Sequence, residues 1–555
     1  MHRFVDNNRR KIHYTDEQYD KLPKEIKHLI NLDRLTVAKN RIKRLPNKIK
    51  YLINLTCLNL SNNSLTALPM EIKYLDTLTS LVLQYNKFMV IPKEIVYLSN
   101  LEYLCFSNNR IRIFPQEIQY CCKLKSVNMA NNYITLVTKE IKYCCKLKYL
   151  KLSHNQISIL PEEIKYLNGL DKLCISYNKL TVFPKEIAHL TNLYYLNLSH
   201  NGLTSITKEI KCLTGLNKLK LSSNKINRFP KEIKYCCKLQ YLDLSNNYIT
   251  TISKEIKYLT ELSSLNLSNN NLISMAKEIK YCRKLEYLYL SHNKLTVLPK
   301  EFKYLDNLMY IWLSNNSLIS IIKEIKYCCK LQYLYLSHNK LTVLPKEFKY
   351  LDNLAYIWLS NNRLTVSPKE YKYLKRKTIL DLSNNNVSML KFSQKFEYIY
   401  SLNLSHTEIN RIPKYAKNLE WLESLDLSNN KFTTQLKQLK YLTQLRFLSL
   451  SGCQLTALPK EIKYLCRLNE LELSNNQLTI LPKEIKYLEN LERLNLSNNQ
   501  LTVLPKEIKY LNKLEYFILS KNQLMTIIKE ISYLNKLKYL ILQDNQLIYQ
   551  PIETN

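Results

Sequence analysis

Apolar residues recur along this chain at fixed distances from an asparagine, and the pattern repeats every 23 residues. With the asparagine numbered as position 0, apolar side chains occupy positions −8, −5, −3, +2, +5, +9 and +12. The first sixteen repeats place at position 0 Asn40, Asn63, Asn86, Asn109, Asn132, Asn155, Asn178, Asn201, Asn224, Asn247, Asn270, Asn293, Asn316, Asn339, Asn362 and Asn385. The next repeat is one residue shorter, and the period then continues through Thr407, Asn430, Cys453, Asn476, Asn499, Asn522 and Asn545. Such a regular period predicts a solenoid.

The spacing within one repeat predicts a strand, a turn and a short helix. Positions −5 and −3 are apolar and alternate with polar or aromatic residues, which is typical of a strand. Proline is common at position +6, and the K-E-I-K-Y-L segment that follows carries apolar residues one helical turn apart, at +9 and +12. Because a single repeat has one apolar side that it cannot bury alone, successive coils must stack to form a continuous core.

The repeats fill nearly the whole chain and predict one domain. We expect a solenoid of about 23 repeats over residues 21–550, irregular at 386–410, where the period slips by one residue. Residues 1–20 are polar and outside the pattern, and we interpret them as an N-terminal cap segment, with 551–555 as a C-terminal tail. Solenoid ends need polar caps, so a poorly capped end leaves end-to-end self-association as an option.

The motif itself points to a known family. Residues 55–65 read L-x-x-L-x-L-x-x-N-x-L, and residues 68–75 read L-P-x-x-I-x-x-L. This resembles the leucine-rich repeat, in the 23-residue intracellular subtype of Ras-pathway and cell-polarity scaffolds, which also occurs in some bacteria and large DNA viruses. The resemblance implies a curved α/β repeat solenoid with a parallel β-sheet on the concave face and short helices or 3-10 turns on the convex face. It also implies that the asparagine side chains bond the backbone of adjacent coils. Thr407 departs from asparagine beside the one-residue deletion and the degenerate 386–400 stretch, which suggests a local kink.

Function in that family is usually protein binding, and composition agrees. Four glycines in 555 residues form no G-x-G-x-x-G or G-x-x-x-x-G-K pattern, which argues against the common nucleotide enzymes. No nucleophile with its base and no zinc-type cysteine spacing stands out, so we expect no enzyme activity, no cofactor and no metal site. Fifteen cysteines without an apolar leader or a long apolar run indicate an intracellular, cytoplasmic protein with reduced thiols and no transmembrane segment.

The concave positions −6 and −4 hold the best candidates for partner binding. In four consecutive repeats both are aromatic, and histidine follows at the rim position −1 in two of them. The predicted binding residues are Tyr287, Tyr289, Tyr310, Trp312, Tyr333, Tyr335, Tyr356, Trp358, His292 and His338, with Asn315 and Asn361 beside them. Trp and Tyr are enriched at binding hot spots, so we expect an exposed patch that takes a protein partner of unknown identity. Residues 287–308 nearly recur at 333–354, however, so duplication with cross-strand stacking is the alternative.

The excess of positive charge points to an alternative function. Lys plus Arg number 82 against 46 Asp plus Glu, a net charge of +36, and lysine fills positions +7 and +10 of most repeats beside tyrosine at +11. Such a convex face either binds nucleic acid or an anionic surface, or is simply a solvated face copied with the repeat. The concave lining is mixed, which weakens nucleic acid as its ligand. It carries Asp243, Asp381, Asp426, Glu470 and Glu472 against Lys151, Lys218, Lys220 and Arg493.

Overall fold

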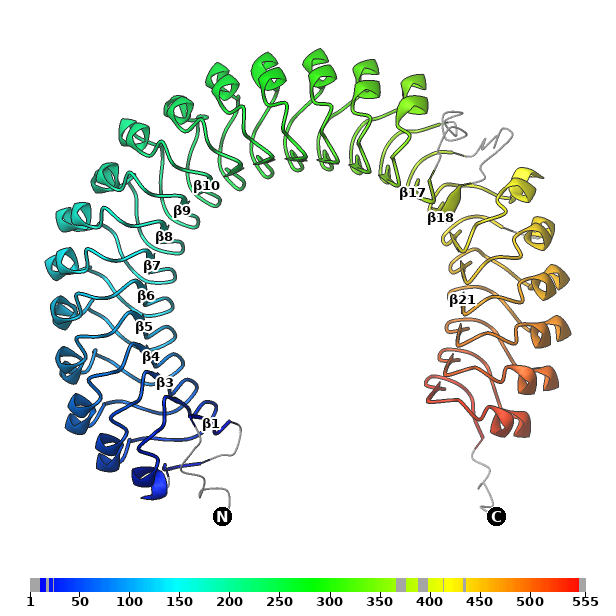
Figure 1. The fold of residues 1–555 in the computed structure, drawn as a ribbon. Helices are drawn as coiled ribbons and strands as arrows, with labels where there is room; N and C mark the ends of the chain where they lie inside the picture. The colour runs from blue at the N-terminus through cyan, green and yellow to red at the C-terminus, as the bar shows by residue number, and fades with distance from the viewer. Residues whose placement is uncertain are drawn as a thin grey trace. The chain divides into compact units, whose positions relative to one another are not determined.

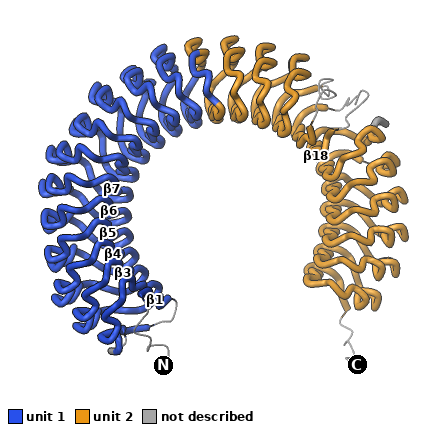
Figure 2. Tube along the Cα trace, viewed as in Figure 1, with its two compact units in different colours: residues 1–272, 281–285 blue, residues 273–280, 286–555 orange. Residues whose placement is uncertain are grey.

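The computed structural model describes residues 10–15, 19–22, 24–365, 376–387, 398–412, 414–432 and 436–548. The chain divides into two compact units (Figure 2): unit 1 comprises Met1–Leu272 and Tyr281–Leu285, and unit 2 comprises Ile273–Lys280 and Glu286–Asn555. Each unit is a curved stack of coils with short strands on its concave side and 3-10 helices on its convex side (Figure 1). The predicted solenoid architecture is therefore confirmed within each unit.

Unit 1 holds a parallel sheet in which each strand pairs with the strand of the next coil. Its described strands are β1 (Lys11–His13), β2 (Arg34–Thr36), β3 (Cys57–Asn59), β4 (Ser80–Val82), β5 (Tyr103–Cys105), β6 (Ser126–Asn128), β7 (Tyr149–Lys151), β8 (Lys172–Cys174), β9 (Tyr195–Asn197), β10 (Lys218–Lys220), β11 (Tyr241–Asp243) and β12 (Ser264–Asn266). The first of these lies in the segment interpreted from sequence as a cap, and it pairs directly with β2.

Unit 2 repeats the same arrangement. Its described strands are β13 (Tyr287–Tyr289), β14 (Tyr310–Trp312), β15 (Tyr333–Tyr335), β16 (Tyr356–Trp358), β17 (Thr378–Asp381), β18 (Ile399–Asn403), β19 (Ser424–Asp426), β20 (Phe447–Ser449), β21 (Glu470–Glu472), β22 (Arg493–Asn495), β23 (Tyr516–Ile518) and β24 (Tyr539–Ile541). Between β17 and β18 the register shifts, because Thr378 pairs with Ile399 while the next residue, Ile379, pairs with Ser401. This irregularity falls where the sequence period slips, although residues 388–397 and the predicted tail at 551–555 lie outside the described part.

The helical turns are 3-10 helices of five residues each. The described ones are η1 (Lys24–His28), η2 (Asn47–Tyr51), η3 (Met70–Tyr74), η4 (Lys93–Tyr97), η5 (Gln116–Tyr120), η6 (Lys139–Tyr143), η7 (Glu162–Tyr166), η8 (Lys185–His189), η9 (Lys208–Cys212), η10 (Lys231–Tyr235), η11 (Lys254–Tyr258), η12 (Lys277–Tyr281), η13 (Lys300–Tyr304), η14 (Lys323–Tyr327), η15 (Lys346–Tyr350), η17 (Lys414–Asn418), η18 (Lys437–Tyr441), η19 (Lys460–Tyr464), η20 (Lys483–Tyr487), η21 (Lys506–Tyr510) and η22 (Lys529–Tyr533). In η3 the extended Pro69 precedes the turn, and its carbonyl accepts the N–H of Ile72 at 3.0 Å. Ile72 in turn accepts from Leu75 at 3.0 Å, so the bonds span three residues, as 3-10 geometry requires.

The core contains the apolar positions predicted from the period. In the repeat of Asn63 these are Leu55, Leu58, Leu60, Leu65, Leu68, Ile72 and Leu75, and all are buried. Larger side chains fill the same positions elsewhere, as where Phe88 meets Phe106 edge to face with ring centroids 5.3 Å apart. Each core side chain therefore packs within its own coil and against neighbouring coils, as expected of a solenoid.

The buried asparagines join one coil to the next. The side chain of Asn247 donates to the carbonyl of Leu221 in the preceding coil at 3.0 Å and to that of Leu244 in its own coil at 3.1 Å. Its Oδ1 accepts the backbone N–H of Ile226 at 3.0 Å. The same set of bonds recurs in most described coils, for example at Asn86 and Asn499. The hydrogen bonds implied by the family resemblance are thus confirmed.

One residue in every described coil, at position −1, has a left-handed backbone. The non-glycine members have φ between +52° and +58°: Lys39, Asn62, Tyr85, Asn108, Asn131, His154, Tyr177, His200, Ser223, Asn246, Asn269, His292, Asn315, His338, Asn361, Asn384, His406, Asn429, Asn475, Asn498, Lys521 and Asp544. Glycine stands there only as Gly452, where an added Cβ would meet the Oδ1 of Asn429. Asn tolerates this conformation well, whereas Tyr and Lys do not favour it.

Candidate functional site

The four strands β13 to β16 bring the predicted aromatic residues together in two stacked columns. Tyr287, Tyr310, Tyr333 and Tyr356 occupy equivalent positions on neighbouring strands and form the first column. Their successive ring centroids lie 4.9, 4.4 and 4.4 Å apart, with the planes tilted by no more than 13°. Such spacing is that of offset-stacked aromatic rings.

The second column runs beside the first and contains Tyr289, Trp312, Tyr335 and Trp358. Its centroids are 4.1, 5.2 and 4.2 Å apart, and the planes are again almost parallel. Within β14 the rings of Tyr310 and Trp312 also stack at 5.5 Å, which links the two columns. We call these eight residues the aromatic columns.

Stacking changes what the aromatic columns present to solvent. The sequence led us to expect an exposed patch, yet all eight side chains are half-buried, and each ring stacks on at least one neighbour in its column. Burial, followed by the nearby tyrosines, also raises the pKa of Tyr289 and Tyr335. The four inner rings are therefore stacked on both faces within the columns, and the four end rings on one face.

The predicted rim residues lie on the same coils as the aromatic columns. His292 is exposed, and its Nε2 lies 3.4 Å from the side-chain nitrogen of Asn315 on the next coil. His338 is exposed one coil further on, at the same left-handed position. The structure thus gathers all ten predicted residues on one stretch of unit 2.

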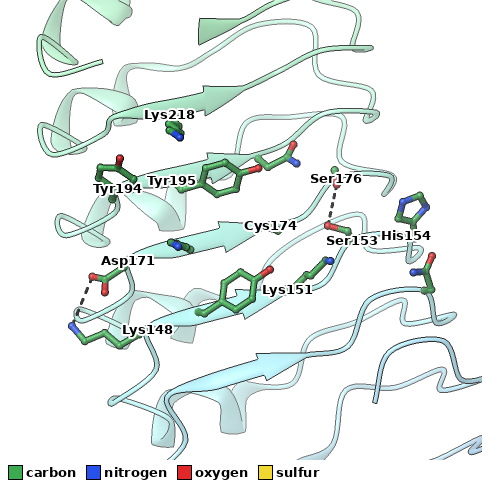
Figure 3. Close-up of a pocket in the computed structure, with 14 residues that line it drawn as sticks. Lys148, Lys151, Ser153, His154, Asp171, Cys174, Ser176, Tyr194, Tyr195 and Lys218 are labelled. Carbon is green, nitrogen blue, oxygen red and sulfur yellow. Dashed lines mark hydrogen bonds and ion pairs between the residues drawn. The ribbon is translucent and has the colours of Figure 1, made fainter. Parts of the chain in front are cut away.

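Unit 1 carries a second concave feature that the sequence did not single out. An open hollow of about 900 Å³ lies over β7 to β10 and is lined by four lysines and a single aspartate (Figure 3). We call it the basic hollow, and its lining residues are Asn131, Lys148, Tyr149, Lys151, Ser153, His154, Asp171, Lys172, Cys174, Ser176, Tyr194, Tyr195, Asn197 and Lys218. Strand pairing sets Tyr149, Lys172, Tyr195, Lys218 and Tyr241 in one row, so tyrosine and lysine alternate from coil to coil.

The carboxylates near the basic hollow are already engaged. Asp171 pairs with Lys148 at its edge, with 3.8 Å between Nζ and Oδ1. Asp243, on the next strand beyond, is buried and accepts from the backbone N–H of Ser245 at 3.1 Å and from its hydroxyl at 2.7 Å. In the described part of the chain, no carboxylate lies within ion-pair distance of Lys151, Lys172 or Lys218. The basic hollow therefore has an uncompensated positive charge.

Cys174 shows how closely the lysines gather. Burial raises the pKa of this thiol, while a hydrogen bond with Tyr149 and the charges of Lys151, Lys220 and Lys172 lower it. Burial prevails, so the pKa of the thiol is higher than that of an ordinary cysteine. The charges of three lysines therefore act on this one thiol.

Two histidines enclose a tyrosine at the rim of the basic hollow. Tyr177 stacks between His154 and His200, with centroids 4.0 and 3.8 Å away. Partial burial, then His200, then Lys151 lower the pKa of His154. The two histidines lie two coils apart, at the same left-handed rim position as Tyr177 between them. Tyr177 and Lys172 were missed, although the alternation of tyrosine and lysine at position −6 could have revealed the row.

On the convex face, lysine and tyrosine pair within each helical turn. The Nζ of Lys142 lies 5.1 Å from the ring centre of Tyr143, and that of Lys234 lies 5.0 Å from that of Tyr235. Equivalent pairs recur along both units. These distances are typical of cation–π contacts, which occupy part of the ring surface that a nucleic-acid base would need.

The described residues show little other chemistry. In the Cys-Cys pairs the first thiol is buried and the second is exposed, as Cys144 and Cys145 illustrate. No group of three or more His, Cys, Asp or Glu in the described ranges is arranged to hold a metal ion. Of the helices placed by the structure, none has the length and apolar character needed to cross a bilayer.

Comparisons with known proteins agree with this architecture. Models described as leucine-rich repeat match residues 54–75, 76–134, 214–272, 261–318, 283–341, 329–387 and 397–455, and a leucine-rich repeat region model matches 128–236 and 429–553. No curated protein matches the sequence. Among solved structures, a leucine-rich repeat protein of Leptospira interrogans is 35% identical over 66% of this chain and 92% of its own, with a TM-score of 0.55.

Two plant receptors are also similar. The plant peptide hormone receptor RGFR1, solved in complex with RGF2, is 28% identical over 95% of this chain and 88% of its own, with a TM-score of 0.61. The Arabidopsis receptor kinase HAESA, in complex with the peptide hormone IDA and the co-receptor SERK1, is 27% identical over 97% and 86%, with a TM-score of 0.59. With family models matching more than half of its residues, the chain belongs to the leucine-rich repeat family.

Proposed function

We propose that this protein is a non-enzymatic scaffold that binds a protein partner on its concave face, at the aromatic columns and the rim residues His292 and His338. Leucine-rich repeat solenoids in general serve protein interaction rather than catalysis. The observation that supports the site is the pair of columns of Tyr and Trp rings, which gathers eight half-buried aromatic side chains on one concave surface. These residue types dominate binding hot spots because they combine large apolar area with a hydrogen-bonding group.

Two neighbouring structures support a partner made of protein. HAESA is solved in complex with the peptide hormone IDA, and RGFR1, a plant peptide hormone receptor, is solved in complex with RGF2. An intracellular location is part of the proposal, and it is supported by fifteen free thiols. Duplication with structural stacking is the competing explanation of the aromatic columns, so a decisive experiment must separate loss of binding from loss of stability.

The test compares two sets of four substitutions in unit 2. The first replaces Tyr310, Trp312, Tyr356 and Trp358 by Ala. The matched control removes tyrosines of the convex face, with Ala at Tyr304, Tyr327, Tyr350 and Tyr441. Proteins captured from the native cell by the wild type are purified, and their affinities for all three forms are measured. We expect the dissociation constant to rise at least about 100-fold for the first set and to be unchanged for the control.

A fluorescence readout locates the bound partner. The protein has three tryptophans, and only Trp421 lies outside the aromatic columns. In a Trp421→Phe variant the emission comes from Trp312 and Trp358, so a partner bound on the columns shifts it. A partner that binds the first set as tightly as the wild type contradicts the proposal. A lowered melting temperature without any loss of affinity assigns the columns to structural stacking instead.

The convex lysine and tyrosine rows support a second candidate, binding of nucleic acid or an anionic surface. In support, each cation–π pair places one lysine beside the tyrosine of the same turn, and these pairs recur from coil to coil. Under this alternative, affinity for an oligonucleotide falls steeply with salt concentration. A filter-binding titration at two salt concentrations tests it, and an affinity that does not depend on salt rejects it.

End-to-end self-association is a further proposal. In the last described coil, Leu537 and Leu540 are half-buried, whereas the equivalent Leu514 and Phe517 one coil earlier are fully buried. Sedimentation at increasing protein concentration is expected to show a rising mass. A constant monomer mass at high concentration contradicts this proposal.

A further inference from the structure

We propose that the basic hollow of unit 1 binds an acidic polypeptide segment in an extended conformation, with carboxylates spaced three residues apart. This site is separate from the aromatic columns in residues and in ligand chemistry. It rests on Lys151, Lys172 and Lys218, whose ammonium groups share one concave surface without a carboxylate partner in the part of the molecule described.

Charge complementarity identifies the sign of the ligand. Asp171 is engaged with Lys148, and Asp243 is buried in bonds to Ser245, so neither carboxylate neutralises the hollow. Lys172 and Lys218 are exposed, and they lie two strands apart, about 9.6 Å at the usual strand spacing. That separation is close to one Debye length at physiological salt, so an anion between them is attracted by both.

Geometry identifies the form of the ligand. A polyproline II segment repeats every three residues and rises about 3.1 Å per residue, so side chains three apart lie about 9.3 Å apart on one face. This matches the two-strand separation of Lys172 and Lys218. Tyr195 lies between them in the same row, half-buried, and offers its ring to the proline or apolar residue between two acids. The row therefore alternates contacts for an acid, an apolar residue and a second acid.

The limited extent of the lysines favours a peptide over a nucleic acid. On the strand before the hollow, β6 carries Ser126 and Asn128 at the equivalent positions, and β11 on the other side carries Tyr241 and Asp243. The lysines thus cover four strands, about 14 Å between the outermost. A nucleic-acid strand carries a phosphate at every nucleotide, so its negative charge would extend past the lysines at both ends of the hollow. A short acidic segment is neutralised within the hollow.

The test uses the full chain and fluorescein-labelled peptides. The probe contains Glu-Pro-Pro-Glu-Pro-Pro-Glu, and the neutral control replaces each Glu by Gln. We expect the acidic peptide to bind at least about tenfold more tightly than the neutral one, by fluorescence anisotropy, and to weaken as salt rises from about 50 mM to about 300 mM. Equal binding of the two peptides overturns the proposal.

Matched variants locate the site. Replacing Lys151, Lys172 and Lys218 by Gln is expected to reduce affinity for the acidic peptide at least about tenfold. The control replaces convex lysines of the same three repeats by Gln: Lys165, Lys185 and Lys234. It removes the same charge and is expected to bind like the wild type. All six lysines are at the surface, and circular dichroism checks that both variants keep the fold. Equal loss in both variants reduces the effect to net charge and overturns the proposal.

Three further arms distinguish the alternatives. The variant Lys172→Glu with Lys218→Glu is expected to bind Lys-Pro-Pro-Lys-Pro-Pro-Lys in place of the acidic peptide. Failure to do so refutes the proposed ion pairs between these two positions and charged peptide residues spaced three apart. A thymidine oligonucleotide that binds the hollow more tightly than the peptide assigns it to nucleic acid, and full competition by millimolar inorganic phosphate assigns it to a small anion. The aromatic-column variant is expected to retain peptide binding, so failure here is distinct from failure of the scaffold function.

Discussion

The side-chain oxygen of Asn430 accepts the backbone N–H of Thr407 in the preceding coil, at 3.0 Å. It also accepts the N–H of Ile409, at 3.2 Å. In regular coils the N–H at position 0 donates instead to a backbone carbonyl of the next coil, as Asn247 does to Asn269 at 3.2 Å. Asn476 accepts from Cys453 in the same way as Asn430 from Thr407. Where a coil lacks its asparagine, the next asparagine therefore takes over the contact.

Asn247→Ala tests the contribution of one such asparagine. The substitution leaves the buried N–H of Ile226 without its partner and removes one of the two side-chain donors to the carbonyl of Leu221, the other being Asn224. We expect the free energy of unfolding to fall by about 2 to 3 kcal/mol, measured by urea denaturation. Asn247→Cys is expected to cost less, because the thiol of Cys453 donates across the coils to Leu427 at 3.2 Å. Equal losses for Ala and Cys would contradict this account, and the exposed Asn192→Ala is the control.

Phe106→Ala tests how far a core defect spreads. Phe106 is fully buried and meets Phe88 of the neighbouring coil edge to face. The cavity is expected to cost about 3 to 5 kcal/mol, and Phe106→Leu about 1 kcal/mol. Because coils contact mainly their neighbours, hydrogen exchange is expected to accelerate in the adjoining coils first. Uniform acceleration along the whole chain would show instead that the solenoid unfolds as one unit.

The stack of His154, Tyr177 and His200 predicts a pH dependence. The pKa of His154 is lowered by partial burial, by His200 and by Lys151, so the folded state favours the neutral ring relative to the unfolded chain. Stability from this residue is therefore present above the unfolded pKa of about 6.5 and is lost as pH falls through the folded pKa.

A proton NMR titration checks the pH prediction directly. The midpoint of His154 is expected below about 6.5, and Tyr177→Ala is expected to raise it more than Lys151→Gln does, because burial is the largest cause of the shift. A midpoint at or above the ordinary value refutes the prediction.

The Cys-Cys pairs predict a sharp contrast in thiol reactivity. Burial, with a smaller effect of neighbouring thiols, raises the pKa of Cys144 to about 12, while Cys145 beside it is exposed. Iodoacetamide at mildly alkaline pH is expected to modify Cys145 within minutes and to spare Cys144 until the protein unfolds. Mass spectrometry of the peptide that contains both residues reports each site, and urea-unfolded protein is the control in which both react. Early modification of Cys144 would show that this coil opens readily.

The left-handed rim position predicts a stabilising glycine. Tyr85 has φ +54° and is 52% exposed, so burial of the residue offsets little of its backbone strain. Tyr85→Gly is expected to raise the free energy of unfolding by about 0.5 to 1 kcal/mol, after the greater flexibility of glycine in the unfolded chain is deducted. Ser80→Gly in β4 is the control and is expected to lower it. A loss of stability in both would show that the Tyr85 ring contributes more than the strain costs.

Much of the fold could be predicted because every coil has to bury apolar side chains at the same positions. Leu58, Leu60 and Ile72 were identifiable as core from their spacing alone, since only a stack of coils buries them all. The alignment of Tyr289 with Trp312 was equally predictable, because a constant period places equivalent residues on neighbouring strands. Whether their faces are open or covered depends on side-chain rotation, which the period does not determine.

The basic hollow could not be recognised for a different reason. Counted along the whole chain, concave charges of both signs nearly balance. Locally they do not, because Asp243 is buried against its own strand end and Asp171 pairs with Lys148. Such pairing depends on distances between side chains. The register shift at Ile399 was likewise hidden, since the sequence shows only that a residue is missing and not which strand absorbs the change.

The left-handed turn at position −1 is the same whether Asn108, His200, Ser223 or Lys521 occupies it. The hydrogen bonds of the coil, rather than the side chain, hold that backbone in place. Side chains at this position can therefore be exchanged one at a time, about 4.8 Å apart, while the backbone of the surrounding coils stays the same. Protein engineering that aims at a new binding specificity would therefore start with substitutions at position −1.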